Sequence, residues 1–299
     1  MTLLRFDPLL MTQSSSSPSP HASSGADLSS VYLPGMPYRH YKGGAYAIVG
    51  LGVIESDLSQ VVVYESMRDR SRLWVRPLDV FAENVPTPQG TQPRFAPDWP
   101  ASLGCLDFLP RATVLQVLGC YDAPYRHYHD RRHVLEMFEA AQARGVALTP
   151  AQALAVLFHD AVYVPGCEHN EAASAVLIET MIVGVDAAVT SLAARIVMDT
   201  RGHRASVPES EVVLDLDLCR LAASPADFDA WTAAVFEENR ALLANRTGLD
   251  GDALFAAFMQ RRIAFLQGLA QRAQLFLTPA FADCEALARA NIARMAAGG

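Results

Sequence analysis

The histidines of this 299-residue sequence are concentrated in one part of the chain. Six of the eight lie between positions 127 and 203: His127, His129, His133, His159, His169 and His203. Several acidic residues lie in and beyond the same stretch. Imidazole nitrogens and carboxylate oxygens together are suitable ligands for divalent transition-metal ions. These histidines and the acids around them are therefore the first candidates for a functional site.

His129 and His133 are four residues apart, so on a helix they would share one face and address one site. Histidine pairs at this spacing are also common on ordinary helix surfaces and in cores, so the spacing alone is a weak signal. Asp130 stands where the H-E-x-x-H metalloprotease helix has its glutamate, which excludes that class of enzyme.

His159 and Asp160 follow a strongly apolar run, and we expect them to lie within an apolar helix. An ionised carboxylate there is costly unless a cation neutralises it, and either an arginine or a metal ion would do so. Adjacent side chains on a helix project about 100° apart, yet both can reach one ion in a groove between helices.

Asp215 and Asp217 lie among leucines in residues 213–218. For Asp215, a metal ligand and a structural acid that caps a helix or pairs with an arginine are both open interpretations. For Asp217 we favour the role of metal ligand, because it completes an ordered set with His133, His159 and Asp160.

The ordered set His133, His159-Asp160 and Asp217 resembles the HD superfamily of metal-dependent phosphohydrolases, and more narrowly one bacterial subfamily of it. The motifs that carry the resemblance lie at residues 124–133, 158–163, 170–175 and 214–218, and a further one at 290–294. The resemblance covers about residues 108–297. Ala161-Val162-Tyr163 follow the His-Asp pair where nucleotidase and alarmone-hydrolase members have acids, so those activities are not inferred.

The resemblance implies an all-α HD fold and makes His133, His159, Asp160 and Asp217 the metal ligands. The cofactor is expected to be a divalent ion (Mn, Mg, Fe, Co, Ni or Zn), which the ligand types do not distinguish. Such an ion lowers the pKa of a bound water and polarises a phosphoryl oxygen, so the expected reaction is phosphoester hydrolysis.

The other candidate site residues surround these ligands in the sequence. Asp160 and Glu171 are assigned catalytic roles, Glu171 either as a base that orients water or as a partner of a ligand imidazole, against the alternative of an exposed helix carboxylate. Arg126, His129, Asn170 and His203 are assigned to substrate binding, with His203 alternatively a ligand of a second metal. His127 and His169 are given no role.

Two functions from different classes follow. The first is a metal-dependent phosphohydrolase that acts on a small phosphorylated metabolite or nucleotide. The second is a non-catalytic, metal-dependent ligand sensor or interaction module, in which an N-terminal domain passes the signal to a partner.

The elements that must position these residues are helical from about residue 103 onward. Thr149-Pro150, Ser224-Pro225 and Thr278-Pro279 each combine a capping side chain with a proline, which is typical of a helix start. Residues 108–299 are therefore predicted to be an all-α domain.

Residues 34–96 are predicted to form a small antiparallel β domain, SH3-like or barrel-like. Short β-branched and aromatic runs lie at residues 45–49, 60–64 and 73–76, and a helical turn is expected at 78–83. Residues 38–44, 62–64 and 73–77, with Phe81, resemble a small bacterial domain of unknown function, DUF1653, over about residues 36–95. Its aromatic residues form either a compact core or, with Arg39, His40, Lys42 and Arg76, a face that binds phosphate or a nucleic-acid backbone.

The remaining segments are predicted to connect or precede these domains. Residues 1–33 are Ser/Pro-rich and expected to be a flexible leader. The proline-rich residues 85–99 are interpreted as a linker, and the boundary between the domains is set at a linker of residues 97–107. The chain is thus an α+β protein of two domains.

The composition limits the partners of the protein. With a net charge of −8 and 51% hydrophobic residues, the chain can bury a core, and it is poorly suited to bind nucleic acid or anionic membrane through bulk charge. Five widely spaced cysteines without a C-x-x-C pair predict no disulfide framework and a reducing compartment. No apolar run reaches the ~18 residues of a membrane span, so we expect a cytoplasmic protein.

Overall fold

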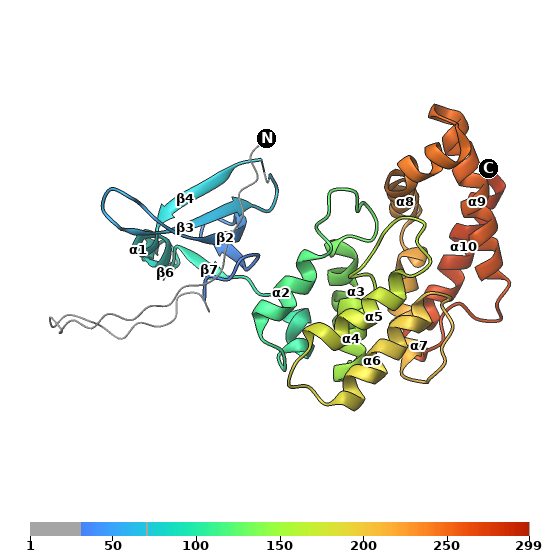
Figure 1. Ribbon diagram of the computed structural model, residues 1–299, viewed down its shortest axis with the longest axis horizontal. Coiled ribbons are helices and arrows are strands. Elements are labelled where there is room, and N and C mark those ends of the chain that lie inside the picture. The colour runs from blue at the N-terminus through green and yellow to red at the C-terminus, as the bar shows by residue number, and fades with distance from the viewer. Residues whose placement is uncertain (1–30, 70, 299) are drawn as a thin grey trace.

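The computed structural model describes residues 31–69 and 71–298, which fold into an N-terminal β-sheet part and a C-terminal helical part (Figure 1). The predicted leader falls almost wholly on residues 1–30, which lie outside the described residues. The two-domain prediction, β first and helical second, is confirmed in these coarse terms.

The sheet part contains one five-stranded antiparallel sheet in the order β4-β3-β2-β1-β7. Its strands are β1 (Pro37–His40), β2 (Ala45–Val53), β3 (Gln60–Ser66), β4 (Leu73–Pro77) and β7 (Phe95–Pro97). Helix α1 (Leu78–Ala82) follows β4, and β5 (Asn84–Thr87) pairs with β6 (Gly90–Pro93) as a separate hairpin. The last strand returns to the first, which leaves β4 and β7 at the two edges of the sheet among the described residues.

Aromatic side chains fill the core between this sheet and α1. Phe81 and Phe95 stack with their ring centroids 4.1 Å apart, and Tyr38 and Tyr64 meet Phe81 edge to face. All four side chains are buried. These four aromatic side chains therefore form a compact core, in agreement with the first of the two interpretations, whereas Trp74 is exposed.

The interpretation of residues 85–99 as a linker is wrong, because they contain β5, β6 and β7. Proline removes one backbone donor and is tolerated at edges and in two-stranded hairpins, where that donor is not needed. Pro86, Pro93 and Pro97 occupy such positions. Within the predicted linker 97–107, the 3₁₀ helix η2 (Ala101–Leu106) buries Leu103 and Leu106 in the core of the helical part.

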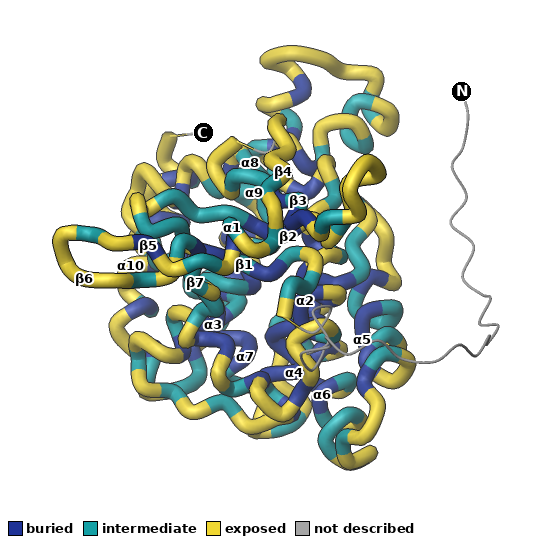
Figure 2. The backbone as a smooth tube through the Cα atoms, turned by 90° about the vertical axis from the view of Figure 1, so that its left-hand side faces the viewer, coloured by how far each residue is buried: buried dark blue, intermediate teal, exposed yellow. Residues whose placement is uncertain are grey.

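The helical part, in the described range 98–298, is built around one buried helix. Ala153 to Phe158 of α4 have no exposed surface (Figure 2). Helices α2, α3, α5, α6 and α7 all contact α4. The bounds are α2 (Arg111–Gly119), α3 (Arg131–Ala143), α4 (Pro150–Phe158), α5 (Asn170–Met181), α6 (Ala187–Thr200), α7 (Ser210–Leu218), η3 (Cys219–Ala222), α8 (Pro225–Thr247), α9 (Gly251–Ala270), η4 (Pro279–Phe281) and α10 (Ala282–Gly298).

The predicted helix starts agree with the structure. Thr149 forms a capping box with Gln152 at the start of α4, and Ser224 accepts the backbone N–H of Asp227 at the start of α8. Thr278 precedes η4, which leads into α10. Among the described residues, none of the helices combines the length and the apolar character that crossing a bilayer would require.

Candidate functional site

His133 reaches the interior from the first turn of α3. Asp130 caps this helix by accepting the backbone N–H of His133, and the imidazole is 1% exposed. His129 lies before the helix begins, so the expectation that both histidines share one helix face is wrong. The chain before α3 nevertheless brings the His129 and His133 rings to a centroid distance of 6.4 Å.

His159 and Asp160 lie at the C-terminal end of α4 rather than inside it, because α4 ends at Phe158. The last carbonyls of a helix have no partner within the helix and must find donors elsewhere. The Tyr121 hydroxyl supplies one donor, to the Leu157 carbonyl at 2.9 Å, and Arg126 holds the turn that follows by donating to the carbonyls of Asp160 at 2.7 Å and Ala161 at 3.0 Å. The turn after the helix is thereby held so that both the His159 and Asp160 side chains face α3 and α7.

The structure brings together the side chains predicted to bind metal. One ligand atom each of His133, His159 and Asp160 lies within 4.8 Å of the others. Asp217 of α7 places Oδ1 3.0 Å from His133 Nε2 and 3.9 Å from His159 Nε2. Two atoms that each lie about 2.0–2.6 Å from one ion are less than about 5 Å apart. His133, His159 and Asp160 meet this limit with one another, and Asp217, which is not part of that three-residue set, meets it with the two imidazoles.

The hydrogen bonds of His159 also suit a metal ligand. Its Nδ1 lies 2.9 Å from the Val156 carbonyl, which fixes the proton on Nδ1 in the neutral ring and leaves a lone pair on Nε2. The Nε2 atom is buried without a well-formed hydrogen bond. A buried acceptor that faces two carboxylates and lacks a donor has the environment that a cation would complete.

Charges within the cluster hold its carboxylates in the ionised form. Burial alone would raise the pKa of Asp217, but hydrogen bonds from His133 and His203 outweigh burial and lower this pKa well below its usual value. Burial likewise opposes protonation of His159, yet the adjacent Asp160 raises the pKa of that imidazole to about 9. The site is thus an anionic cluster that attracts positive charge, here protons and equally a metal ion.

His203 contacts the cluster from the turn after α6. Its Nε2 lies 3.1 Å from Asp217 Oδ2, the oxygen that faces away from His133. The backbone of His203 has a φ of +47°, a conformation that residues other than glycine rarely adopt. Arg272 donates to the carbonyls of Gly202 and His203 and so holds this turn in place.

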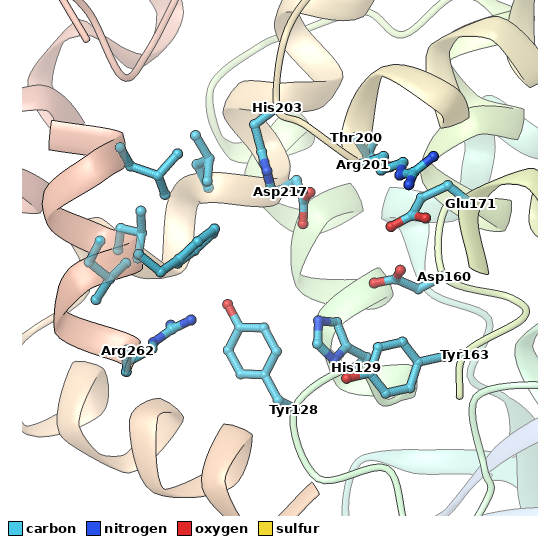
Figure 3. A pocket seen from close by; sticks show the side chains of 15 residues that line it. Tyr128, His129, Asp160, Tyr163, Glu171, Thr200, Arg201, His203, Asp217 and Arg262 are labelled. Carbon is cyan, nitrogen blue, oxygen red and sulfur yellow. Dashed lines mark ion pairs between the residues drawn. The ribbon is translucent and has the colours of Figure 1, made fainter. Parts of the chain in front are cut away.

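A cavity of about 170 Å³ lies beside the cluster (Figure 3). Asp160, Asp217, His129, His203 and Glu171 line it, with Glu171 reaching in from the first turn of α5. The other lining residues are Tyr128, Tyr163, Thr200, Arg201, Leu218, Leu221, Arg262, Phe265, Leu266 and Leu269. Of the predicted substrate-binding residues, His129 and His203 therefore face the cavity.

The predicted substrate-binding roles of Arg126 and Asn170 do not fit their positions. Arg126 is 7% exposed and its terminal nitrogens donate to backbone carbonyls. The Asn170 side-chain amide accepts a hydrogen bond from the backbone N–H of Val164 and donates one to the Val164 carbonyl. Both side chains stabilise the loops around the cavity, a role that their chemical type alone did not reveal.

Glu238 of α8 is a residue that the sequence did not single out. One of its oxygens accepts the backbone N–H groups of His127, Tyr128 and His129 at 3.0 Å each, and the other lies 2.5 Å from His129 Nδ1. Burial would raise its pKa, but these donors outweigh burial and lower the pKa of Glu238 to about 2. Glu238 thus orients His129, whose Nε2 is left for the cavity.

The two acids of α7 have different environments. Asp215 is fully buried and accepts the backbone N–H groups of Leu277 and Thr278, and the Thr278 hydroxyl as well. It therefore holds the segment before η4, a structural role whose partners are two backbone N–H groups and a hydroxyl rather than the start of its own helix or an arginine. Asp217, two residues later, faces the imidazoles.

The basic residues of the β part are mostly paired with neighbours. Arg39 binds Asp98 at 2.6 Å, Arg76 donates to the Tyr64 hydroxyl, and Arg94 binds Glu83. Lys42 lies over the ring of Tyr41. A face that binds phosphate or nucleic acid stays a prediction for this part of the molecule.

Comparison with known proteins identifies the β part. Residues 36–97 match the family model described as a protein of unknown function, DUF1653. The crystal structure of a DUF1653 protein from Bordetella bronchiseptica is 40% identical over 22% of this chain and 85% of that chain, with a TM-score of 0.20. A search of curated proteins gave no match to the chain. Residues 36–97 of this chain are therefore a DUF1653 domain.

Proposed function

We propose that the helical part is an HD-type, metal-dependent phosphohydrolase whose substrate is a small phosphorylated metabolite or nucleotide. The observation that carries the proposal is the convergence of His133, His159, Asp160 and Asp217 next to the cavity. The order of these residues along the chain is that of the HD superfamily, and their donor atoms suit one divalent cation.

His133, His159, Asp160 and Asp217 would hold the ion. A bound divalent ion would supply a nucleophilic hydroxide at neutral pH and charge stabilisation for a phosphoryl group. His203 would keep Asp217 in place through its contact with Oδ2, and so acts as a positioning residue.

Two side chains on the cavity wall would handle protons and the substrate. Glu171 can accept a proton from a water in the cavity, because its carboxylate faces the same space as that of Asp160 (Figure 3). His129 can donate from Nε2 to a phosphoryl or leaving-group oxygen, and its pKa supports this role: burial opposes protonation, but Asp160 and Glu238 raise the pKa above the usual value.

The test is a phosphatase screen with protein purified without chelator and loaded in turn with Mn²⁺, Mg²⁺, Fe²⁺, Co²⁺, Ni²⁺ and Zn²⁺. Asp160→Ala and His159→Ala should lose both bound metal and phosphate release. His127→Ala is the matched control, since that histidine is nearby but its side chain is exposed. Phosphate release by Asp160→Ala at the wild-type rate would refute the proposal. Tight binding of phosphorylated ligands without any product would favour a ligand sensor instead.

A further inference from the structure

Helix α9 places one charged residue into an otherwise apolar wall of the cavity. Its cavity-lining residues are Arg262, Phe265, Leu266 and Leu269, which follow the spacing of a single helix face. Leu266 and Leu269 are buried and pack in the helical core. A leucine at position 262 would continue this face, so an arginine there needs a reason other than packing.

The guanidinium of Arg262 lies over the Phe265 ring, with its carbon atom 5.9 Å from the ring centroid. It makes no hydrogen bond or ion pair with any residue in the ranges 31–69 and 71–298, and its Nε atom is buried without an acceptor. Burial lowers the pKa of its guanidinium. Removing a cation from water without a partner is costly, and that cost is offset when an anion binds to it.

The Tyr128 hydroxyl lies beside Arg262 in the same part of the cavity. Figure 3 shows this oxygen between Arg262 on one side and Asp217 on the other. No hydrogen bond of the hydroxyl to another described residue is present, while the Tyr128 ring packs against His133 and Arg220. The oxygen is thus fixed by its ring and free to donate to a ligand.

Two carboxylates of the cavity, those of Asp217 and Asp160, already have histidine side chains as neighbours. Asp217 contacts His133 and His203, and Asp160 contacts His159. Arg262 therefore does not serve to neutralise the metal cluster. It stands across the cavity from that cluster, where apolar side chains around it lower the local dielectric and strengthen its attraction for an anion.

We propose that Arg262, with the Tyr128 hydroxyl, binds the phosphoryl oxygens of the substrate on the side opposite His159 and Asp160. The proposal rests on the proposed function and names the residue that makes the cavity specific for a phosphate ester. A guanidinium can donate two parallel hydrogen bonds to one phosphoryl group, which an ammonium cannot match in geometry.

The test measures binding of inorganic phosphate by isothermal titration calorimetry to metal-loaded wild type, Arg262→Gln, Arg262→Lys and Arg261→Gln. Arg261 precedes Arg262 on α9 but is exposed, so its variant is the matched control. Charge-assisted hydrogen bonds contribute about 1.5–3 kcal/mol, so Arg262→Gln should raise the Kd for phosphate at least about 10-fold. Arg262→Lys should give an intermediate Kd, and Arg261→Gln the wild-type value. Metal content and thermal midpoint, measured on each variant, show that the fold and the cluster are retained.

Equal Kd values for wild type and Arg262→Gln would overturn the inference, and so would an equal loss in Arg261→Gln. The two proposals fail separately. If the wild type hydrolyses phosphate esters and Arg262→Gln does so with unchanged KM, the Arg262 assignment fails and the phosphohydrolase stands. If no ester is hydrolysed but phosphate binding depends on Arg262, the phosphohydrolase fails and the anion site stands.

Discussion

The helical part and the β part both contain clusters of ionisable and aromatic residues, but the two clusters differ in burial and in pairing. In the β part, Arg39 and Arg94 lie near the surface and each already binds a carboxylate. In the helical part, His133 and His159 are almost completely buried, and each has one ring nitrogen without a well-formed hydrogen bond.

Polar groups that are buried and incompletely paired destabilise a fold unless a ligand completes them. Exposed ion pairs contribute little to stability and do not need a ligand to complete them. The contrast directs the search for chemistry to the helical cavity, although the β part is the region with a family match. It also defines four experiments, which run from the largest expected effect to the smallest.

Asp160→Ala should produce the largest effect in the molecule. A metal ion contributes several kcal/mol to the stabilisation of a phosphoryl-transfer transition state, so its loss should lower kcat/KM by about 10³-fold or more. Metal content per chain, measured by elemental analysis, should fall with the activity. If Asp160→Ala retained stoichiometric metal, the buried cluster would not be the cation site. The difference in burial and pairing between the helical part and the β part would then not indicate where the ion binds.

Asp215→Ala tests whether the neighbouring acid of α7 is structural. The substitution leaves the N–H groups of Leu277 and Thr278 and the Thr278 hydroxyl without their acceptor, which should cost on the order of 3 kcal/mol. For a chain of this size that corresponds to a fall in Tm of about 6–12 °C. The folded variant should still bind metal, whereas Asp217→Asn should lose metal. The same metal loss in both variants would show that Asp215 belongs to the site.

Glu238→Gln tests how His129 is held. The pKa of Glu238 in the folded chain is about 2, below the usual 4.5, so its ionised form stabilises the fold at pH values above 4.5. That stabilisation is lost as the pH falls from 4.5 through about 2. The lowered pKa corresponds to about 3 kcal/mol of stabilisation at pH 7, which Glu238→Gln should remove.

Urea unfolding of wild type and Glu238→Gln at pH 7 and at pH 3 provides the measurement. The difference in unfolding free energy between the two proteins should be smaller at pH 3 than at pH 7. A difference that does not change with pH would mean that the carboxylate acts by packing rather than by charge.

Arg39→Ala in the β part should have the smallest effect. The pair with Asp98 joins two partly exposed side chains, and exposed ion pairs contribute about 0–1 kcal/mol. Chemical denaturation should therefore show a loss of less than about 1 kcal/mol, with metal content and phosphate release unchanged. A marked loss of phosphate release would mean that the β part takes part in the chemistry.

Local patterns allowed much of the fold to be predicted. The capping residues Thr149 and Ser224 were recognisable because a helix start needs a side-chain acceptor at a fixed offset. The strands of residues 85–97 were missed because prolines usually interrupt strands, and only the pairing of β1 with β7 and of β5 with β6 shows that the affected positions are at edges.

The candidate site was predictable only where side-chain type and sequence order carry the signal. His133, His159, Asp160 and Asp217 could be selected together because the ordered set resembles a family. Arg126, Glu238 and Arg262 could not be assigned correctly, since their roles depend on which carbonyls, amides or open space the tertiary fold places beside them. Backbone carbonyls accept hydrogen bonds from Arg126, whereas no such acceptor among the described residues lies beside Arg262. The amino-acid sequence does not reveal this difference.

The most direct test of the account is anomalous diffraction from crystals of the chain loaded with Mn²⁺ or Zn²⁺, recorded at the absorption edge of the metal. A peak is expected in contact with His133, His159, Asp160 and Asp217, at the ~2.0–2.3 Å that such ligands adopt. A loaded protein whose anomalous peak lies elsewhere, with these four side chains ligating nothing, would contradict this expectation.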